Sequence, residues 1–466
     1  MRKLTDNLLQ PSLSLLHGIS MRPLTLAQIA HMLSVQASPK IVTPTGFCVD
    51  TCQLERGQIY VALKGARVDG HAFLEEAQKR GACAALVSQG YTGPHFGLPL
   101  ISVKDPLEAF QSLARQLCQQ SKTRAVAITG SIGKTTTKEF VKQLLSKQYR
   151  VAATPGNNNS QIGLPLALLN HTDGTEEILV VEMGMTHPGN IKGLMSIVTP
   201  ELAVITTTAL VHACNFDSLL EITRAKAEIL DHLDTKQAFI HRDIEGYDEI
   251  LQRGPCVKSS FSTTHPAADY RLAMDHERMS IIEKGIAHPV GILNLPGKHN
   301  RHNLLAAIAV ARYFGVDWNA IRDTIPELQL PERRLQRVLH KGITFINDAY
   351  NAAELSVKSA LESLPEPGEG GTKIAVLASM MELGKFSEDC HYRVAEHALN
   401  YVEKIYCMGL ECRPIYDLWT QHGRPVELFM DRNSLVDKLR IDLKPKDVVL
   451  LKGARSKELW KVIEEL

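Results

Sequence analysis

The sequence contains no uninterrupted apolar run of the roughly 20 residues that a membrane-spanning helix requires. Its N-terminus is basic and then only partly apolar. Asp6, Asn7, Gln10 and Pro11 interrupt the continuous core that a signal peptide would need. We therefore expect no membrane insertion and a cytoplasmic location.

The chain also carries almost no net charge, because 52 basic and 51 acidic side chains give a formal value of +1. Without a global basic field, we do not expect it to bind nucleic acid. Its nine cysteines include no C-x-x-C pair, and the spacings from Cys48 to Cys52 and from Cys407 to Cys412 do not match common zinc frameworks. Reduced, mostly structural thiols of a cytosolic protein fit this pattern.

Apolar residues are abundant enough for more than one core. The chain has 466 residues, 44% of them hydrophobic, which exceeds the size of one ordinary domain. We expect an α/β protein with an N-terminal extension at 1–20, a small α/β domain at 21–121, a central domain with a mostly parallel sheet at 122–330, and a C-terminal Rossmann-like domain at 331–466. A monomer is the default expectation.

Short apolar runs alternate with helical patterns along most of the chain. The strand-like runs are GQIYVAL, AALVS and LPLISV, then AVAIT, ILVVE and AVITTT, and finally ITFIND, KIAVLA, EKIYCMG, VELFM and DVVLLKG. Helical segments between such runs favour β-α-β units and parallel sheets. The cluster PEPGEGG at 365–371 is predicted to be a surface connection.

A glycine-rich loop lies between the run AVAIT and the helical segment at 138–148. It consists of Thr129, Gly130, Ser131, Ile132, Gly133, Lys134, Thr135 and Thr136. Amides at a helix N-terminus bind polyphosphates, while a lysine and a threonine hydroxyl in these positions contact phosphate oxygens and Mg²⁺. Full Walker A spacing would need glycine at Ile128, so the match is to the shorter G-x-x-G-K-T form. The alternative is a chance glycine turn before a helix.

The order and spacing of several motifs resemble the ATPase domain of the Mur ligase family. These motifs are TGSIGKTTTKE, TPGNNNSQIGLPL from Thr154, VVEMGMTHPGNI from Val180, RAKAEIL from Arg224 and PGKHNRHN from Pro296. INDAYNA from Ile346 and MELG from Met381 are similar to motifs of the members that add D-alanyl-D-alanine. RGQIYVALKGARVDGHAF from Arg56 resembles the domain that holds the UDP end of the substrate. The resemblance implies an ATP- and Mg²⁺-dependent ligase that joins D-alanyl-D-alanine to UDP-N-acetylmuramoyl-tripeptide through an acyl phosphate.

The resemblance also implies roles for individual residues. Its catalytic set is Lys134, Glu182, His212, Lys226 and Arg334. Thr135, Glu182 and His212 would bind metal, as would Lys226 once carbamoylated by CO₂. Asn300, Asn303 and Asp348 join the glycine loop and Arg334 in binding ATP. The implied substrate-binding residues are Thr51, Lys64, Gly65, Asp69, Gly70, His71, Asn157 and Asn351.

Each of these residues has a simpler alternative. Glu182 would be a polar strand cap, and His212 a structural hydrogen-bonding group. Lys226 would be a solvated lysine paired with nearby acids. Asn300 and Asn303 would be helix caps. The segment around Lys64 to His71 would be an ordinary strand and tight turn.

The chain departs from the family pattern at three places. Asp50-Thr51-Cys52 replaces D-S-R, Ala353-Glu354 replaces N-P, and Ala378-Ser379-Met380 replaces G-D-M. We expect these changes to affect substrate contacts more than ATP use.

Three other functions compete with this prediction. The ligase that adds the third amino acid usually shows D-Y-A-H-x-P where this chain has INDAYNA. Folylpolyglutamate synthase would not have the N-terminal nucleotide-sugar domain. A catalytically silent nucleotide-binding regulator would not need Lys134, Glu182, His212, Lys226 and Arg334 together.

Overall fold

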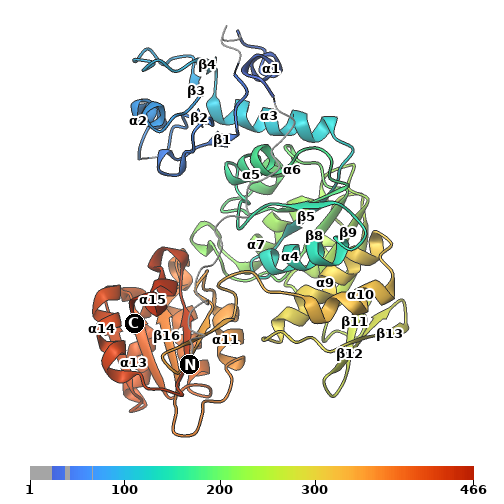
Figure 1. The fold of residues 1–466 in the computed structure, drawn as a ribbon. Coiled ribbons are helices and arrows are strands. Elements are labelled where there is room, and N and C mark those ends of the chain that lie inside the picture. Colours follow the sequence, from blue (N-terminus) through green and yellow to red (C-terminus); the bar gives the residue numbers. More distant parts are fainter. Residues whose placement is uncertain (1–23, 37–41, 66) are drawn as a thin grey trace, which may run out of the picture. The chain divides into compact units, whose positions relative to one another are not determined.

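The computed structural model describes residues 24–36, 42–65 and 67–466 (Figure 1). The predicted extension at 1–20 lies outside the described residues, as does the predicted domain start at Met21. The chain forms two compact units. One contains the residues up to 122 together with 165–176, and the other contains 123–164 and 177–466.

The first unit is built on a fully parallel four-stranded sheet in the order β1-β2-β3-β4. Its strands are β1 (Phe47–Cys48), β2 (Ile59–Val61), β3 (Ala84–Ser88) and β4 (Leu100–Val103), and its helices are α1 (Leu26–Met32), α2 (Leu74–Lys79) and α3 (Pro106–Gln120). Most of α5 (Gly163–His171) also belongs here. The Asn170 amide accepts from the Phe47 N–H at 2.8 Å and donates to the Phe47 carbonyl at 2.9 Å, which joins α5 to the sheet.

The second unit contains a nine-stranded sheet in the order β13-β12-β11-β10-β9-β8-β5-β7-β6. Its strands are β5 (Arg124–Thr129), β6 (Val151–Ala153), β7 (Ile178–Glu182), β8 (Leu202–Ile205), β9 (Gln237–His241), β10 (Val257–Ser262), β11 (Tyr270–Asp275), β12 (Arg278–Glu283) and β13 (Ile286–Gly291). The pairs β11–β12 and β12–β13 are antiparallel, and the other pairs are parallel. The central strands are buried throughout, which explains their continuous apolar runs.

Helices cover this sheet and bury its core. They are α4 (Lys134–Leu145), α6 (Asn190–Met195), α7 (Leu219–Lys226), α8 (Tyr247–Ile250), α9 (His299–Tyr313) and α10 (Trp318–Thr324). Helices α4 and α9 pack against each other in one hydrophobic cluster with β5, β7 and β8. Alanines at 306, 307, 309 and 311 on α9 are fully buried.

The C-terminal part of the second unit has a six-stranded sheet in the order β14-β15-β19-β16-β17-β18, in which only β14 is antiparallel. Its strands are β14 (Gln336–His340), β15 (Ile343–Asn347), β16 (Lys373–Ala378), β17 (Lys404–Met408), β18 (Val426–Phe429) and β19 (Val448–Lys452). Its helices are α11 (Glu354–Glu362), α12 (Ser387–Ala398), α13 (Arg413–Gln421), α14 (Arg432–Asp442) and α15 (Val462–Glu465). The segment 365–371 connects α11 to β16 at the surface, as predicted.

Each sheet of the second unit reverses its strand order at one point. In the nine-stranded sheet β5 lies between β7 and β8, and in the six-stranded sheet β19 lies between β15 and β16. Ligands bind open α/β sheets in the crevice at the carboxyl ends of the strands beside such a reversal. The predicted α/β fold with mostly parallel sheets is therefore confirmed, and it places two ligand-binding edges in this unit.

Two further expectations concern the chain as a whole. Among the described residues, no helix is both long and apolar enough to cross a membrane. All nine cysteines lie in the described part of the chain and are free thiols there, and five of them are buried.

Candidate functional site

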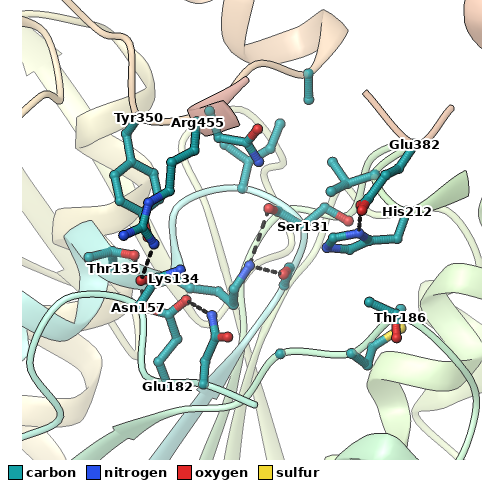
Figure 2. Close-up of a pocket in the computed structure, with 18 of the residues that line it drawn as sticks. Ser131, Lys134, Thr135, Asn157, Glu182, Thr186, His212, Tyr350, Glu382 and Arg455 are labelled. Carbon is teal, nitrogen blue, oxygen red and sulfur yellow. Dashed lines mark hydrogen bonds and ion pairs between the residues drawn. The ribbon is translucent and has the colours of Figure 1, made fainter. Parts of the chain in front are cut away.

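A cavity of about 650 Å³ lies between the carboxyl edges of the two large sheets (Figure 2). The nine-stranded sheet supplies the glycine loop, Glu182, His212 and Lys226. The C-terminal sheet supplies Arg334, Tyr350, Asn351, Glu382 and Arg455. The cavity thus brings all five predicted catalytic residues together.

The glycine loop follows β5 and leads into α4. Gly130 has φ +145°, and a Cβ on it would lie 1.9 Å from the Thr206 hydroxyl oxygen. Gly133 has φ +91°, and its Cβ would lie 2.3 Å from Oδ1 of Asn303. Glycine is therefore required at both positions, and the loop presents its backbone to the cavity as a polyphosphate site requires.

Lys134 lies within this loop. Its ammonium donates to the carbonyls of Gly130 at 2.7 Å and of Ser131 at 3.3 Å. Burial lowers the pKa of Lys134. The Glu182 carboxylate opposes this shift, and the Arg334 guanidinium adds to it. A cation held in a phosphate loop is suited to neutralise phosphate oxygens.

Glu182 ends β7 and is 1% exposed. Its carboxylate accepts from the Thr135 hydroxyl at 2.8 Å and from the Asn159 amide at 2.6 Å. In the described ranges no three His, Cys, Asp or Glu side chains are grouped to hold a metal ion. The donor set that fits Mg²⁺ here is the Glu182 carboxylate, the Thr135 hydroxyl and oxygens of a bound nucleotide.

Lys226 ends α7 and is only 3% exposed, which contradicts the solvated-lysine alternative. Burial, and then the charge of Lys134, lower the pKa of Lys226 well below its ordinary 10.5. The neighbouring Arg224, in contrast, is exposed and pairs with Glu249 at 2.7 Å, as a solvated cation would. The Lys226 amine is therefore held toward its neutral form beside the cavity.

His212 follows β8 with φ +56° and contacts the Glu382 carboxylate through Nδ1 (Figure 2). Burial lowers the pKa of His212, while Glu382 raises it. The Cys214 N–H donates to the Glu382 carbonyl at 3.0 Å. The loop after β8 is thus joined to the loop after β16.

Tyr350 lines the cavity and contacts two arginines. The Arg334 Cζ is 4.3 Å from the ring centroid, and the Arg455 Cζ is 5.9 Å from it. The Arg455 guanidinium also donates to Oδ1 of Asn157 at 3.1 Å. Burial raises the pKa of the Tyr350 hydroxyl, which favours its neutral form.

Five residues predicted to bind ATP lie behind the cavity wall: Thr129, Thr136, Asn300, Asn303 and Asp348. The two asparagines do not cap α9. Asn303 accepts from Thr137 at 3.4 Å and donates to Asn300 at 3.1 Å, so the pair supports the glycine loop from behind. The Asp348 carboxylate pairs with buried Lys452 at 2.5 Å and accepts from the Leu335 N–H at 3.2 Å.

The remaining predicted substrate residues lie in the first unit, where Lys64, Gly65, Asp69, Gly70 and His71 occupy the segment after β2 and Thr51 follows β1. Nε2 of His71 accepts from the Ser88 N–H at 3.0 Å, so Nδ1 carries the proton and donates to Asp69 at 2.6 Å. This bond is the main cause of the lowered pKa of Asp69. The His71 ring stacks on Tyr91 with centroids 5.2 Å apart. The segment is therefore an ordered polar site at one edge of the small sheet.

The structure adds site residues that the sequence analysis did not single out. Asn159, Tyr350 and Glu382 lie inside quoted motifs, but their motifs did not show which neighbour each side chain meets. Arg455 belongs to none of those motifs. The sequence feature that could have indicated Arg455 is its position two residues after the strand-like run DVVLLKG, at a carboxyl edge.

Family models match three stretches of the chain. They are described as Mur ligase family, catalytic domain (45–117), Mur ligase middle domain (128–311), and Mur ligase, glutamate ligase domain (333–455).

Similar curated proteins include the UDP-N-acetylmuramoyl-tripeptide--D-alanyl-D-alanine ligase of Bacillus subtilis (strain 168), which is 34% identical over 90% of this chain and 93% of its own length. The ligase of the same name from Escherichia coli (strain K12) is 32% identical over 95% of this chain and 98% of its own length.

Similar solved structures include MurF from Acinetobacter baumannii, with 25% identity, a TM-score of 0.83 and coverage of 96% of this chain and 99% of that one. MurF ligase from Thermotoga maritima in complex with ADP has 28% identity, a TM-score of 0.73 and coverage of 90% and 96%.

Proposed function

The chain belongs to the Mur ligase family, and from this premise we propose that it joins D-alanyl-D-alanine to UDP-N-acetylmuramoyl-tripeptide with cleavage of ATP. The product is the UDP-muramoyl-pentapeptide used in peptidoglycan synthesis, and the reaction takes place in the cytoplasm. The observation that carries the proposal is the single cavity in which the phosphate loop of one sheet faces Arg334, Asn351 and Arg455 of the other.

In the first step, the terminal carboxylate of the tripeptide attacks the γ-phosphorus of ATP, which gives an acyl phosphate and ADP. Lys134 and Arg334 stabilise the charge on the phosphoryl group during its transfer. Thr135 and Glu182 would hold Mg²⁺, which when bound would neutralise further charge on the phosphate oxygens. Asn159 fixes the Glu182 carboxylate, since it donates to the oxygen that Thr135 does not contact.

In the second step, the neutral amino group of the dipeptide attacks the acyl carbon. The tetrahedral intermediate expels phosphate with the electron pair of the broken C–O bond, and the amine loses its proton as the peptide bond forms. Water would hydrolyse the acyl phosphate, so the proposal requires that the two sheet edges close around the reacting groups. The same enclosure holds the reacting groups together, so that an encounter of separate molecules becomes one positioned reaction.

Lys226 acts in this proposal as a carbamate. Its neutral amine adds to CO₂ and releases one proton, which converts a cation into an anionic oxygen donor. A lysine with a lowered pKa is suited to this reaction, because only the uncharged amine is nucleophilic. The carbamate and His212 would hold a second Mg²⁺.

The first unit would hold the UDP end of the substrate. Supporting this, the ordered residues Asp69 and His71 and the Tyr91 ring lie together at one edge of the small sheet. Thr51 contributes from the neighbouring strand end, whereas exposed Cys52 stands where the family has arginine. Recognition of the UDP group therefore depends on the segment after β2.

Competition between amines tests the proposed function. Purified protein would receive Mg-ATP, UDP-muramoyl-tripeptide, UDP-muramoyl-dipeptide and equal amounts of D-alanyl-D-alanine, D-alanine and a diamino acid, and the products would be identified by mass. We expect only the tripeptide to be extended, and only by D-alanyl-D-alanine. Extension of the dipeptide acceptor by the free diamino acid would overturn the proposal. With ¹⁸O in the tripeptide carboxylate, one label should appear in the released phosphate, as the acyl phosphate requires.

A further inference from the structure

Arg455 is a cation without a matching anion in the part of the chain that the structure describes. It follows β19, is exposed to the cavity, and donates one hydrogen bond to the neutral amide of Asn157 at 3.1 Å. Its other contact is with Tyr350, whose ring centroid is 5.9 Å from the Arg455 Cζ. An arginine has five N–H donors in a planar fork that matches a carboxylate, so most of its capacity is available to a ligand.

The transferring phosphoryl group already has its own cations. Lys134 lies within the glycine loop, and the charge of Arg334 lowers the pKa of Lys134, which places Arg334 on the phosphate side. Both arginines contact Tyr350, but Arg334 lies closer to its ring, at 4.3 Å, than Arg455, at 5.9 Å. Arg455 is thus a second positive centre, supplied by the last strand of the C-terminal sheet.

Three of the residues that line the cavity with Arg455 are alanines. Ala454 precedes it and is 5% exposed, while Ala352 and Ala353 line the same cavity and are 6% and 4% exposed. Methyl groups at these positions leave room for a ligand whose own side chains are small. A guanidinium beside an alanine-lined wall suits a short peptide that ends in a carboxylate.

We propose that Arg455 binds the terminal carboxylate of the incoming dipeptide, oriented by the Tyr350 ring and the Asn157 amide. The assignment rests on the proposed function, and it specifies how the amine substrate is recognised. A carboxylate held at Arg455 directs the opposite, amino end of a two-residue ligand toward the phosphate loop, where the acyl phosphate forms. Arg455 is in this sense a specificity-determining residue that requires a free carboxylate on the amine substrate.

The test compares D-alanyl-D-alanine with D-alanyl-D-alaninamide in the full-length enzyme and in Arg455→Gln and Arg455→Lys. In the wild type, kcat/KM should fall roughly 10- to 100-fold for the amide, the effect of losing a charge-assisted pair. Arg455→Gln should lose a similar factor with the free acid and show no further loss with the amide. Arg455→Lys should recover part of the discrimination, and KM for ATP should not change in either variant.

Arg413→Gln is the matched control, because Arg413 is also exposed, lies on α13 away from the cavity and pairs with Asp417 at 2.7 Å. Arg413→Gln should show the same loss of kcat/KM with the amide as the wild type. Equal discrimination by Arg455→Gln and wild type, or a raised KM for ATP in Arg455→Gln, would overturn the assignment and indicate a phosphate-binding role. Turnover of neither dipeptide by the wild type would overturn the proposed function itself.

Discussion

His212 and Glu382 meet across the cavity, with the imidazole Nδ1 in contact with the Glu382 carboxylate. Both residues have positive φ, +56° and +61°, so each loop turns sharply to present its side chain. A backbone hydrogen bond of 3.0 Å from Cys214 to Glu382 reinforces the contact. The C-terminal sheet thereby orients a histidine that belongs to the nucleotide-binding sheet.

Glu382→Gln should lower kcat about tenfold, because one charge-assisted hydrogen bond that orients His212 is lost. KM for ATP should remain unchanged, since the phosphate loop is not touched. Asp217→Asn is the control. It breaks the exposed pair with Lys385 (2.8 Å) in the same contact region and should change kcat less than twofold. Equal losses in both variants would mean that Glu382 only joins the two loops.

Lys226 should carry a carbamate in active enzyme. After incubation with ¹³C-bicarbonate, the wild type should show one labelled carbamate carbonyl signal by NMR, and Lys226→Met should show none and lose at least ~100-fold in kcat. Depleting CO₂ should lower the activity of the wild type, and bicarbonate should restore it. Full activity in CO₂-depleted buffer would refute the modification.

The buried pair of Asp348 and Lys452 should be important for stability. Lys452 also donates to the Asn351 carbonyl at 3.1 Å, so the pair holds the turn that carries Tyr350. Asp348→Asn leaves a buried lysine without its counter-charge and should lower the free energy of unfolding by about 3 kcal/mol. Asp437→Asn, which breaks an exposed pair with Arg440, should change it by less than ~0.5 kcal/mol. Similar urea midpoints for the two variants would contradict this view of the pair.

The free energy of unfolding should also decrease as the pH is lowered, because of His299. Burial is the main cause that lowers its pKa from 6.5 to about 4, and the charges of Lys452, His302 and Arg334 add to this, while Asp348 opposes it. The unfolded chain therefore binds the proton more tightly, and the free energy of unfolding decreases as the pH drops from about 6.5 to about 4. The loss from this group approaches about 3 kcal/mol.

His299→Gln cannot take up this proton, so its free energy of unfolding should fall less over the same pH range. Urea unfolding at a series of pH values measures the difference. His241 and His302 also have pKa values lowered by burial, so some loss should remain in the variant. Parallel curves for wild type and His299→Gln would show that His299 keeps its ordinary pKa in the folded protein.

Local pattern was sufficient for the parts of the fold that surround the site. AVAIT and ILVVE are buried on both faces, so their continuous apolar runs predicted strands correctly. The glycine loop between strand and helix was predicted from its spacing. The strands at 257–291 were not predicted. They form one end of the nine-stranded sheet, where runs such as VKSSFS mix polar and apolar residues and are only partly buried.

The sequence could not reveal which side chains meet. Glu382 contacts a histidine 170 positions away, and Arg455 contacts an asparagine 298 positions away. No local periodicity encodes such pairs, because they depend on how two separate sheets face each other. Lys226 shows the same limit, since its helix reads as amphipathic and only the tertiary structure shows that its amine is buried.

Phosphate release is the most direct measurement of the central claim. Purified protein with Mg-ATP and UDP-muramoyl-tripeptide should release phosphate rapidly only when D-alanyl-D-alanine is added, in a one-to-one ratio with a pentapeptide product identified by mass. Lys134→Met should abolish both signals, whereas Lys142→Met, at an exposed position of the same helix, should not. Phosphate release that is independent of the dipeptide, or a folded protein that binds ATP and forms no pentapeptide, would contradict the account.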